Sequence, residues 1–225
     1  IIPPWKYDSN FVAHMRMKDS QFHDYYRSVS ALKEKYKNQI SIKIGLECEY
    51  FPKYMPWLKE LLKEYHLDYI IFGNHYYKTD EDRVYFGTAC EKDDMLEKYV
   101  DEAIEGMKQD CIPIYVIQII YARTKKIWLN FQKQQSYRLC QAAKDMDIPL
   151  EYNLAGAAYN DIMNTTQYPH PEFWKIAAEV GNKTIIGVDA HEPKAMENNK
   201  YRDEAISFLE GLGINIIDTI KFHQF

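Results

Sequence analysis

The chain has 225 residues, of which 46% are hydrophobic and 27% charged, as in an ordinary globular protein. Its net charge of −5 argues against a nucleic-acid binder that neutralises phosphates over a broad surface, although a small phosphorylated substrate needs only a local positive site. No stretch approaches the roughly 20 uninterrupted apolar residues that cross a bilayer. We therefore expect neither nucleic acid nor a membrane as a partner.

The cysteines are scattered along the chain without a Cys-x-x-Cys spacing, at Cys48, Cys90, Cys111 and Cys140. Free thiols in a reducing compartment are the simplest interpretation, so we expect a cytoplasmic protein. The chain begins with Ile1 rather than Met, and no signal sequence follows. We expect that the native protein has residues before Ile1.

The first half of the chain alternates between amphipathic and β-rich segments. Apolar side chains recur at helical spacing over residues 21–38, and they alternate with other residues over 40–50 as in a strand. Pro56 stands at a favourable first helical position, and Asp94 with Glu97 resembles a capping box. In chain order we expect helix, strand, helix, strand, helix and strand over residues 21–38, 40–50, 56–65, 67–72, 96–107 and 112–120.

The second half continues the same alternation. Pro171 begins a helix that carries Phe173 and Trp174, and Gly181 is a typical residue to end it. A short apolar run then leads into Asp189. In chain order we expect helix, strand, helix, strand, helix and strand over residues 132–146, 149–153, 171–180, 184–188, 201–210 and 214–217.

Alternation of strand and helix favours parallel strands covered by helices, an α/β fold. Length alone admits one or two domains, but no linker or change in composition divides the chain, so we expect a single domain over residues 1–225. An open doubly wound sheet is one alternative, although no Gly-rich phosphate loop follows any strand. A barrel that lacks its first strands in this chain is the favoured interpretation.

Groups able to bind metal follow three of the predicted strands, at the edge where α/β folds place their active sites. Glu47 and Glu49 close the first strand, and His75 follows the second. Asp189 and His191 follow the fifth. Each feature alone is more often a solvated or structural one, but carboxylate and imidazole together suit divalent ions that clamp a phosphoryl group. Their coincidence predicts a metal site.

Several motifs resemble those of the PHP histidinol-phosphate phosphatases, in the same order along nearly the whole chain. They are Gly45-Leu46-Glu47-Cys48-Glu49-Tyr50, the His75 segment, Tyr168-Pro169 and Gly187-Val188-Asp189-Ala190-His191. The resemblance implies a distorted TIM-like (β/α)7 barrel of PHP type that lacks its first one or two strands here. It also implies two or three divalent transition-metal ions (zinc, manganese or iron) and hydrolysis of histidinol phosphate in histidine biosynthesis.

The resemblance assigns roles to individual residues. It implies four metal ligands, namely Glu47, His75, Asp189 and His191. Asp189 and His191 would also be the catalytic pair, and Glu49 would lie behind the ligands and orient them. Arg123 would contact the substrate phosphate. Glu151 and Asn153 end another strand and can support the same rim.

The chain departs from the family's pattern in three places. The family's initial His-x-His strand and a further histidine would both lie before Ile1. Where the family usually has His-Pro-Asp, this chain has Ile117-Gln118-Ile119, so an isoleucine replaces a ligand histidine. After Asn153, the family's phosphate-binding arginine is absent. The alternatives are therefore a degenerate barrel that binds a ligand without catalysis, and a PHP phosphoesterase with another small phosphorylated substrate.

Overall fold

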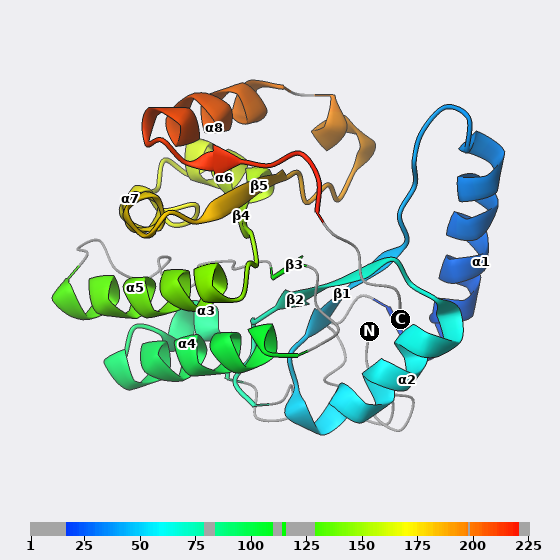
Figure 1. The fold of residues 1–225 in the computed structure, drawn as a ribbon, viewed down its shortest axis with the longest axis horizontal. Coiled ribbons are helices and arrows are strands. Elements are labelled where there is room, and N and C mark those ends of the chain that lie inside the picture. Colours follow the sequence, from blue (N-terminus) through cyan, green and yellow to red (C-terminus); the bar gives the residue numbers. More distant parts are fainter. Residues whose placement is uncertain (1–16, 79–83, 110–113, 116–128, 198, 221–225) are drawn as a thin grey trace.

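The computed structural model describes residues 17–78, 84–109, 114–115, 129–197 and 199–220, in which helices and strands alternate (Figure 1). The helices are α1 (Asp19–Tyr36), α2 (Met55–Tyr65), α3 (Phe86–Ala89), α4 (Asp93–Met107), α5 (Asn130–Asp145), α6 (Leu154–Ile162), α7 (Pro171–Val180) and α8 (Lys200–Gly211), with the short 3-10 helices η3 (Pro52–Tyr54) and η6 (Pro193–Met196). The strands are β1 (Gly45–Glu49), β2 (Tyr69–Gly73), β3 (Ile114–Tyr115), β4 (Leu150–Asn153), β5 (Lys183–Gly187) and β6 (Asn215–Ile216).

The described strands form two parallel three-stranded sheets. In the first sheet β2 lies between β1 and β3, and in the second β5 lies between β4 and β6. Glu49 is the register partner of Gly73, and Asn153 is that of Gly187, so each of these strand pairs ends at one edge. The predicted α/β fold with parallel strands is confirmed. Within the described ranges the strands do not close into a barrel, although β3 and β4 contact each other.

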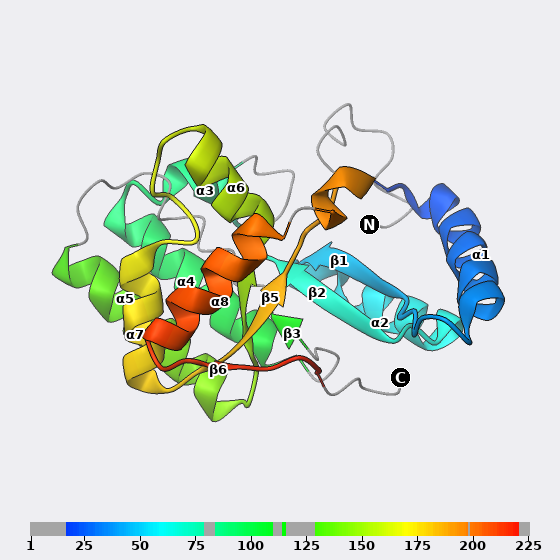
Figure 2. The same ribbon diagram turned by 90° about the horizontal axis from the view of Figure 1, so that it is seen from above.

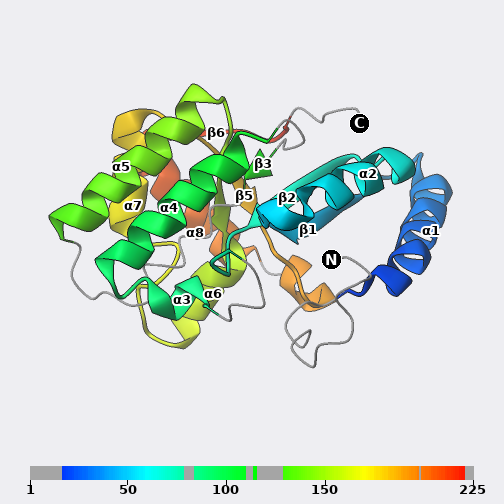
Figure 3. The ribbon, with the colours of Figure 1, turned by 90° about the horizontal axis from the view of Figure 1, so that it is seen from below.

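Helices cover both sheets. The helices α4, α5 and α7 lie side by side, and α6 contacts α8 beside the second sheet (Figures 1 and 3). At the opposite end of the molecule α1 packs beside α2, where the rings of Phe22 and Tyr65 lie 4.7 Å apart (Figure 2). Large side chains such as Phe72, Tyr99 and Trp174 are fully buried and dominate the core. None of the described helices is long and apolar enough to span a membrane.

The predicted helices and strands are present, with differences at their ends. The strand expected over 40–50 is confined to Gly45–Glu49, and most of the one expected over 112–120 lies outside the described residues. The capping box at Asp94 and Glu97 is wrong. The N-cap of α4 is Lys92, two residues earlier, it has no side-chain cap, and Asp94 inside the helix pairs with Lys98 at 3.1 Å. Helices α3 and α6 were not predicted.

Gly181 ends α7 as predicted, in a left-handed conformation with a φ of 81°. A Cβ in that conformation costs an L-residue about 1 kcal/mol, so we expect Gly181→Ala to lower the free energy of unfolding by about this amount in urea denaturation. Gly211→Ala is the control, because an added Cβ at this helical residue meets nothing within 4 Å. This control should be neutral or stabilising by about 0.5 kcal/mol. Equal losses in the two variants would contradict the explanation.

Candidate metal centre

The first group of predicted site residues lies at the carboxyl ends of β1 and β2. Gly73 ends β2, and a Cβ added there would lie 2.5 Å from Cε1 of His75. The same Cβ would lie 3.0 Å from Oε1 of Glu47. The imidazole and the carboxylate therefore converge over one glycine, which leaves the space that they occupy.

Glu49 holds His75 at two points. Oε2 of Glu49 accepts a hydrogen bond from the backbone N–H of His75 at 2.9 Å, while its Oε1 pairs with Nδ1 of the imidazole. Because Nδ1 faces this carboxylate, any bond from the ring to a metal ion would go through Nε2. A carboxylate behind a ligand histidine commonly fixes both the tautomer and the ring orientation.

We expect Glu49→Ala to weaken metal binding about 10–100-fold, because the His75 ring would lose the partner that orients it. The dissociation constant for Zn²⁺ can be measured by competition with a chromophoric chelator. Glu60→Ala is a matched control, since Glu60 is exposed on α2 and pairs with the nearby Lys63. An unchanged affinity in Glu49→Ala would show that His75 needs no such partner, or binds no metal.

The second group lies at the carboxyl ends of β4 and β5. Glu151 and Asn153 alternate with Tyr152 and so face the same side of β4. A Cβ added to Gly187 would lie 1.6 Å from Oε1 of Glu151, so this glycine also leaves room for a carboxylate. Asp189 follows β5 with a φ of 50°, and its Oδ2 accepts a hydrogen bond from Nδ2 of Asn153 at 3.3 Å.

His191 lies beside Asp189 and is exposed. Its Nδ1 is 2.8 Å from the backbone carbonyl oxygen of Asp189 and 3.6 Å from Oδ1 of the same residue. With Nδ1 donating to that carbonyl, Nε2 is the ring atom that a metal ion would use. The two predicted residues, Asp189 and His191, thus lie next to each other just after β5.

Electrostatics links the two groups. Burial is the largest cause that raises the pKa of Glu151 to about 7, the hydrogen bond from Asn153 opposes it, and the negative charges of Asp189 and Glu47 add to it. In the described part of the chain, no lysine or arginine forms an ion pair with these three carboxylates. A divalent cation is a counter-charge that suits such a rim, so the donor chemistry of these residues suits a metal ion.

The predicted ligands nevertheless form two groups rather than one coordination sphere. Among the described residues, no three histidine, cysteine, aspartate or glutamate side chains are grouped so that they could hold one metal ion. Glu47 and His75 make one group, and Asp189 and His191 make the other. Arg123 and the substituted ligand position, residue 117, lie outside the described residues.

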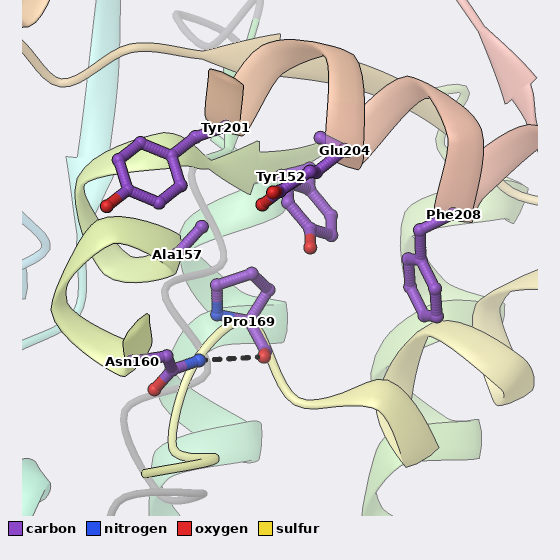
Figure 4. A pocket seen from close by; sticks show the side chains of 8 residues that line it. Tyr152, Ala157, Asn160, Pro169, Tyr201, Glu204 and Phe208 are labelled. Carbon is purple, nitrogen blue, oxygen red and sulfur yellow. Dashed lines mark hydrogen bonds between the residues drawn. The ribbon is translucent and has the colours of Figure 1, made fainter. Parts of the chain in front are cut away.

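A separate cavity of about 260 Å³ lies between β4, α6 and α8 (Figure 4). Its lining includes Tyr152, Asn160, Glu204 and Phe208. Burial, together with the negative charge of Glu204, raises the pKa of Tyr152 to about 12. Because Tyr152 and Glu151 are adjacent on β4, their side chains point to opposite faces. The cavity therefore does not belong to the candidate metal centre.

No protein-family model matches the chain. A probable histidinol-phosphatase of Deinococcus radiodurans is 25% identical over 197 residues, which are 85% of this chain and 72% of that protein. The chain resembles the histidinol-phosphatases. The resemblance predicted from the motifs is thereby confirmed.

A solved structure with a similar fold is the histidinol phosphate phosphatase of Lactococcus lactis, complexed with zinc, L-histidinol and phosphate. The TM-score is 0.67 at 16% identity, and the match covers 90% of this chain and 80% of that one. At this identity the similarity shows the fold alone. The chain has the same fold as a histidinol phosphate phosphatase.

Sequence reasoning missed the two glycines that make room for this site. In Gly73-Asn74-His75 and Gly187-Val188-Asp189, a strand ends at glycine and a predicted ligand stands two residues later. The sequence contained this signal as a repeated Gly-x-ligand spacing. That these positions must lack a Cβ becomes evident only from the structure, where a Cβ at Gly73 would collide with His75 and one at Gly187 with Glu151.

Proposed function

We propose that this protein is a metal-dependent phosphomonoesterase that hydrolyses histidinol phosphate to histidinol and phosphate, a step of histidine biosynthesis. The observation that carries the proposal is a rim of carboxylate and imidazole groups at the carboxyl ends of parallel strands, in a fold shared with a histidinol phosphate phosphatase. The relative from Deinococcus radiodurans carries the name probable histidinol-phosphatase, and the Lactococcus lactis structure holds L-histidinol and phosphate.

We propose the metal ligands Glu47, His75, Asp189 and His191, with Asp189 and His191 as the catalytic pair. Two or three divalent ions would suit this donor set, and the zinc in the Lactococcus lactis structure favours zinc over manganese or iron. Bound ions of this kind polarise a phosphoryl oxygen and lower the pKa of water to about 7. Arg123 is the proposed contact of the substrate phosphate, and residues 1–225 are proposed to form one barrel-type domain.

The side chains of the rim prepare this site in two ways. Glu49 fixes the direction of the His75 ring, and partial burial reduces the contact of Glu151 with solvent. Both effects favour a cation over bulk water as the partner of the carboxylates, because a buried negative charge is costly without a counter-charge.

The test combines metal analysis of the purified protein with hydrolysis of a panel of phosphate esters that contains histidinol phosphate, phosphoserine and glycerol phosphate. We expect at least one bound equivalent of metal, chelator-sensitive release of phosphate, and preference for histidinol phosphate. Preference for another ester would instead favour a phosphoesterase with a different small substrate.

A second candidate function is a barrel that binds a ligand without catalysis. Ile117 favours it, because an isoleucine stands where the resemblance implies a ligand histidine and cannot donate to a metal ion. Full metal occupancy without hydrolysis of any ester in the panel would support this function and contradict the phosphatase.

A further inference from the structure

The side chain of Asn153 joins the start of a helix to the candidate metal centre. Asn153 is the last residue of β4 and the N-cap of α6. It is only 4% exposed, so both ends of its carboxamide need partners inside the protein. At one end, Oδ1 accepts a hydrogen bond from the backbone N–H of Gly156 at 2.8 Å.

At the other end, Nδ2 of Asn153 faces two carboxylates. It lies 3.3 Å from Oδ2 of Asp189 and 3.5 Å from Oε2 of Glu151. The carboxamide cannot be turned around, because the helix N–H requires an oxygen acceptor and the carboxylates require an N–H donor. The start of α6 therefore fixes the direction in which the amide donates.

The start of α6 is itself held in place. A Cβ added to Gly156 would lie 2.6 Å from the backbone oxygen of Tyr168, so the first turn of α6 packs directly against that segment. A neutral amide also differs from a lysine or arginine at the same place. It donates to an oxygen of each carboxyl group without adding a positive charge, so a cation can still supply the counter-charge.

We propose that Asn153 is a positioning residue that sets the orientation of the Asp189 carboxylate and thereby the affinity of the candidate centre for a divalent cation. The bond from Asn153 engages Oδ2 of Asp189, while Oδ1 lies 3.6 Å from Nδ1 of His191. A single hydrogen bond thus determines which oxygen faces the histidine. This inference rests on the proposed function for the assignment of Asp189 as a metal ligand.

The experiment measures the Zn²⁺ dissociation constant of the full chain by competition with a chromophoric chelator. Asn153→Ser retains an oxygen that can cap α6, since serine caps helices about as well as asparagine, but it is too short to reach the carboxylates. We expect the dissociation constant to rise about 10–100-fold, as for other partners that orient a ligand. The denaturation midpoint of the metal-free protein should change little.

Asn160→Ser is the matched control. Asn160 lies on the same helix, where it donates to the backbone oxygen of Pro169 and accepts from the backbone N–H of Gln167. Its replacement disturbs α6 without touching either carboxylate, so the affinity for Zn²⁺ should stay at the wild-type value. If Asn153→Ser folds poorly, Asn153→Thr offers the same capping hydroxyl on a different side chain.

A second measurement separates positioning from support of the fold. In an Asp189→Ala background, Asn153→Ser should cause no further loss of Zn²⁺ affinity, because Asn153 acts through Asp189. A residue that only supports the fold would weaken binding equally in both backgrounds, and that result would overturn the proposal.

Failure of this inference can be told apart from failure of the proposed function. Wild-type Zn²⁺ affinity in Asn153→Ser, in a protein that hydrolyses histidinol phosphate, would overturn the positioning role alone. A wild-type protein that binds Zn²⁺ but hydrolyses no ester would overturn the phosphatase alone, because the affinity comparison needs no substrate. Wild-type protein that binds no Zn²⁺ would overturn both.

Discussion

Asp189→Asn is expected to lower the turnover of histidinol phosphate at least about 100-fold and to leave the protein with less bound metal. Asp189 lies at the end of β5, where its charge acts together with those of Glu151 and Glu47. Loss of a proposed direct ligand should exceed the 10–100-fold loss expected when only an orienting partner is removed. Asparagine is the most suitable replacement, because it keeps the size and shape of the aspartate side chain, removes its charge and tolerates the φ of 50° found at this position.

Phosphate release under substrate saturation and metal content by mass spectrometry together measure this effect. His75→Ala should act in the same direction, since His75 lies in the other group of predicted ligands. Asp203→Asn is the control, because Asp203 is exposed in the first turn of α8. If Asp189→Asn and His75→Ala both kept wild-type metal and turnover, the rim would be wrongly assigned.

The order of helices and strands could be predicted because apolar residues recur with a clear helical or strand periodicity in most elements. The apolar runs at β2 and β5 and the helical spacing in α7 are examples. Helix α6 could not be predicted in this way. It begins directly after β4 without a loop, and its first residues, Leu154-Ala155-Gly156-Ala157-Ala158, are mostly too small to mark an apolar face. The late start of β1, at Gly45, was also hidden, because Ile40 and Ile42 show the same alternation before it, although Ile40 is exposed.

The candidate site was predictable in part for a topological reason. Parallel strands in register end at one edge, so Glu47 and His75 were expected to meet, and the short distances at Gly73 show that they do. The spacing between the two sheets depends on tertiary packing and leaves no pattern in the sequence. Two features could therefore be seen only in the structure. Asp189 and His75 belong to different groups, and Asn153 donates a hydrogen bond to Asp189.

Gly73→Ala should lower the affinity for Zn²⁺ by 10-fold or more, about as much as loss of an orienting partner. The new Cβ would lie 2.5 Å from Cε1 and 2.7 Å from Nδ1 of His75, and 3.0 Å from Oε1 of Glu47. The ring cannot move aside without disturbing its contact with Glu49. One methyl group would thus displace two predicted ligands, and the chelator competition assay measures the result.

Gly45→Ala is the matched comparison, because Gly45 lies at the other end of the same strand pair. A Cβ there would lie 2.6 Å from Cζ of Tyr69, its register partner on β2, so the ring that packs over Gly45 must shift. This variant should lose stability and keep its Zn²⁺ affinity, since no predicted ligand is touched. Equal losses of affinity in the two variants would mean that Gly73→Ala acts by distorting the sheet, and that the space above Gly73 does not serve His75.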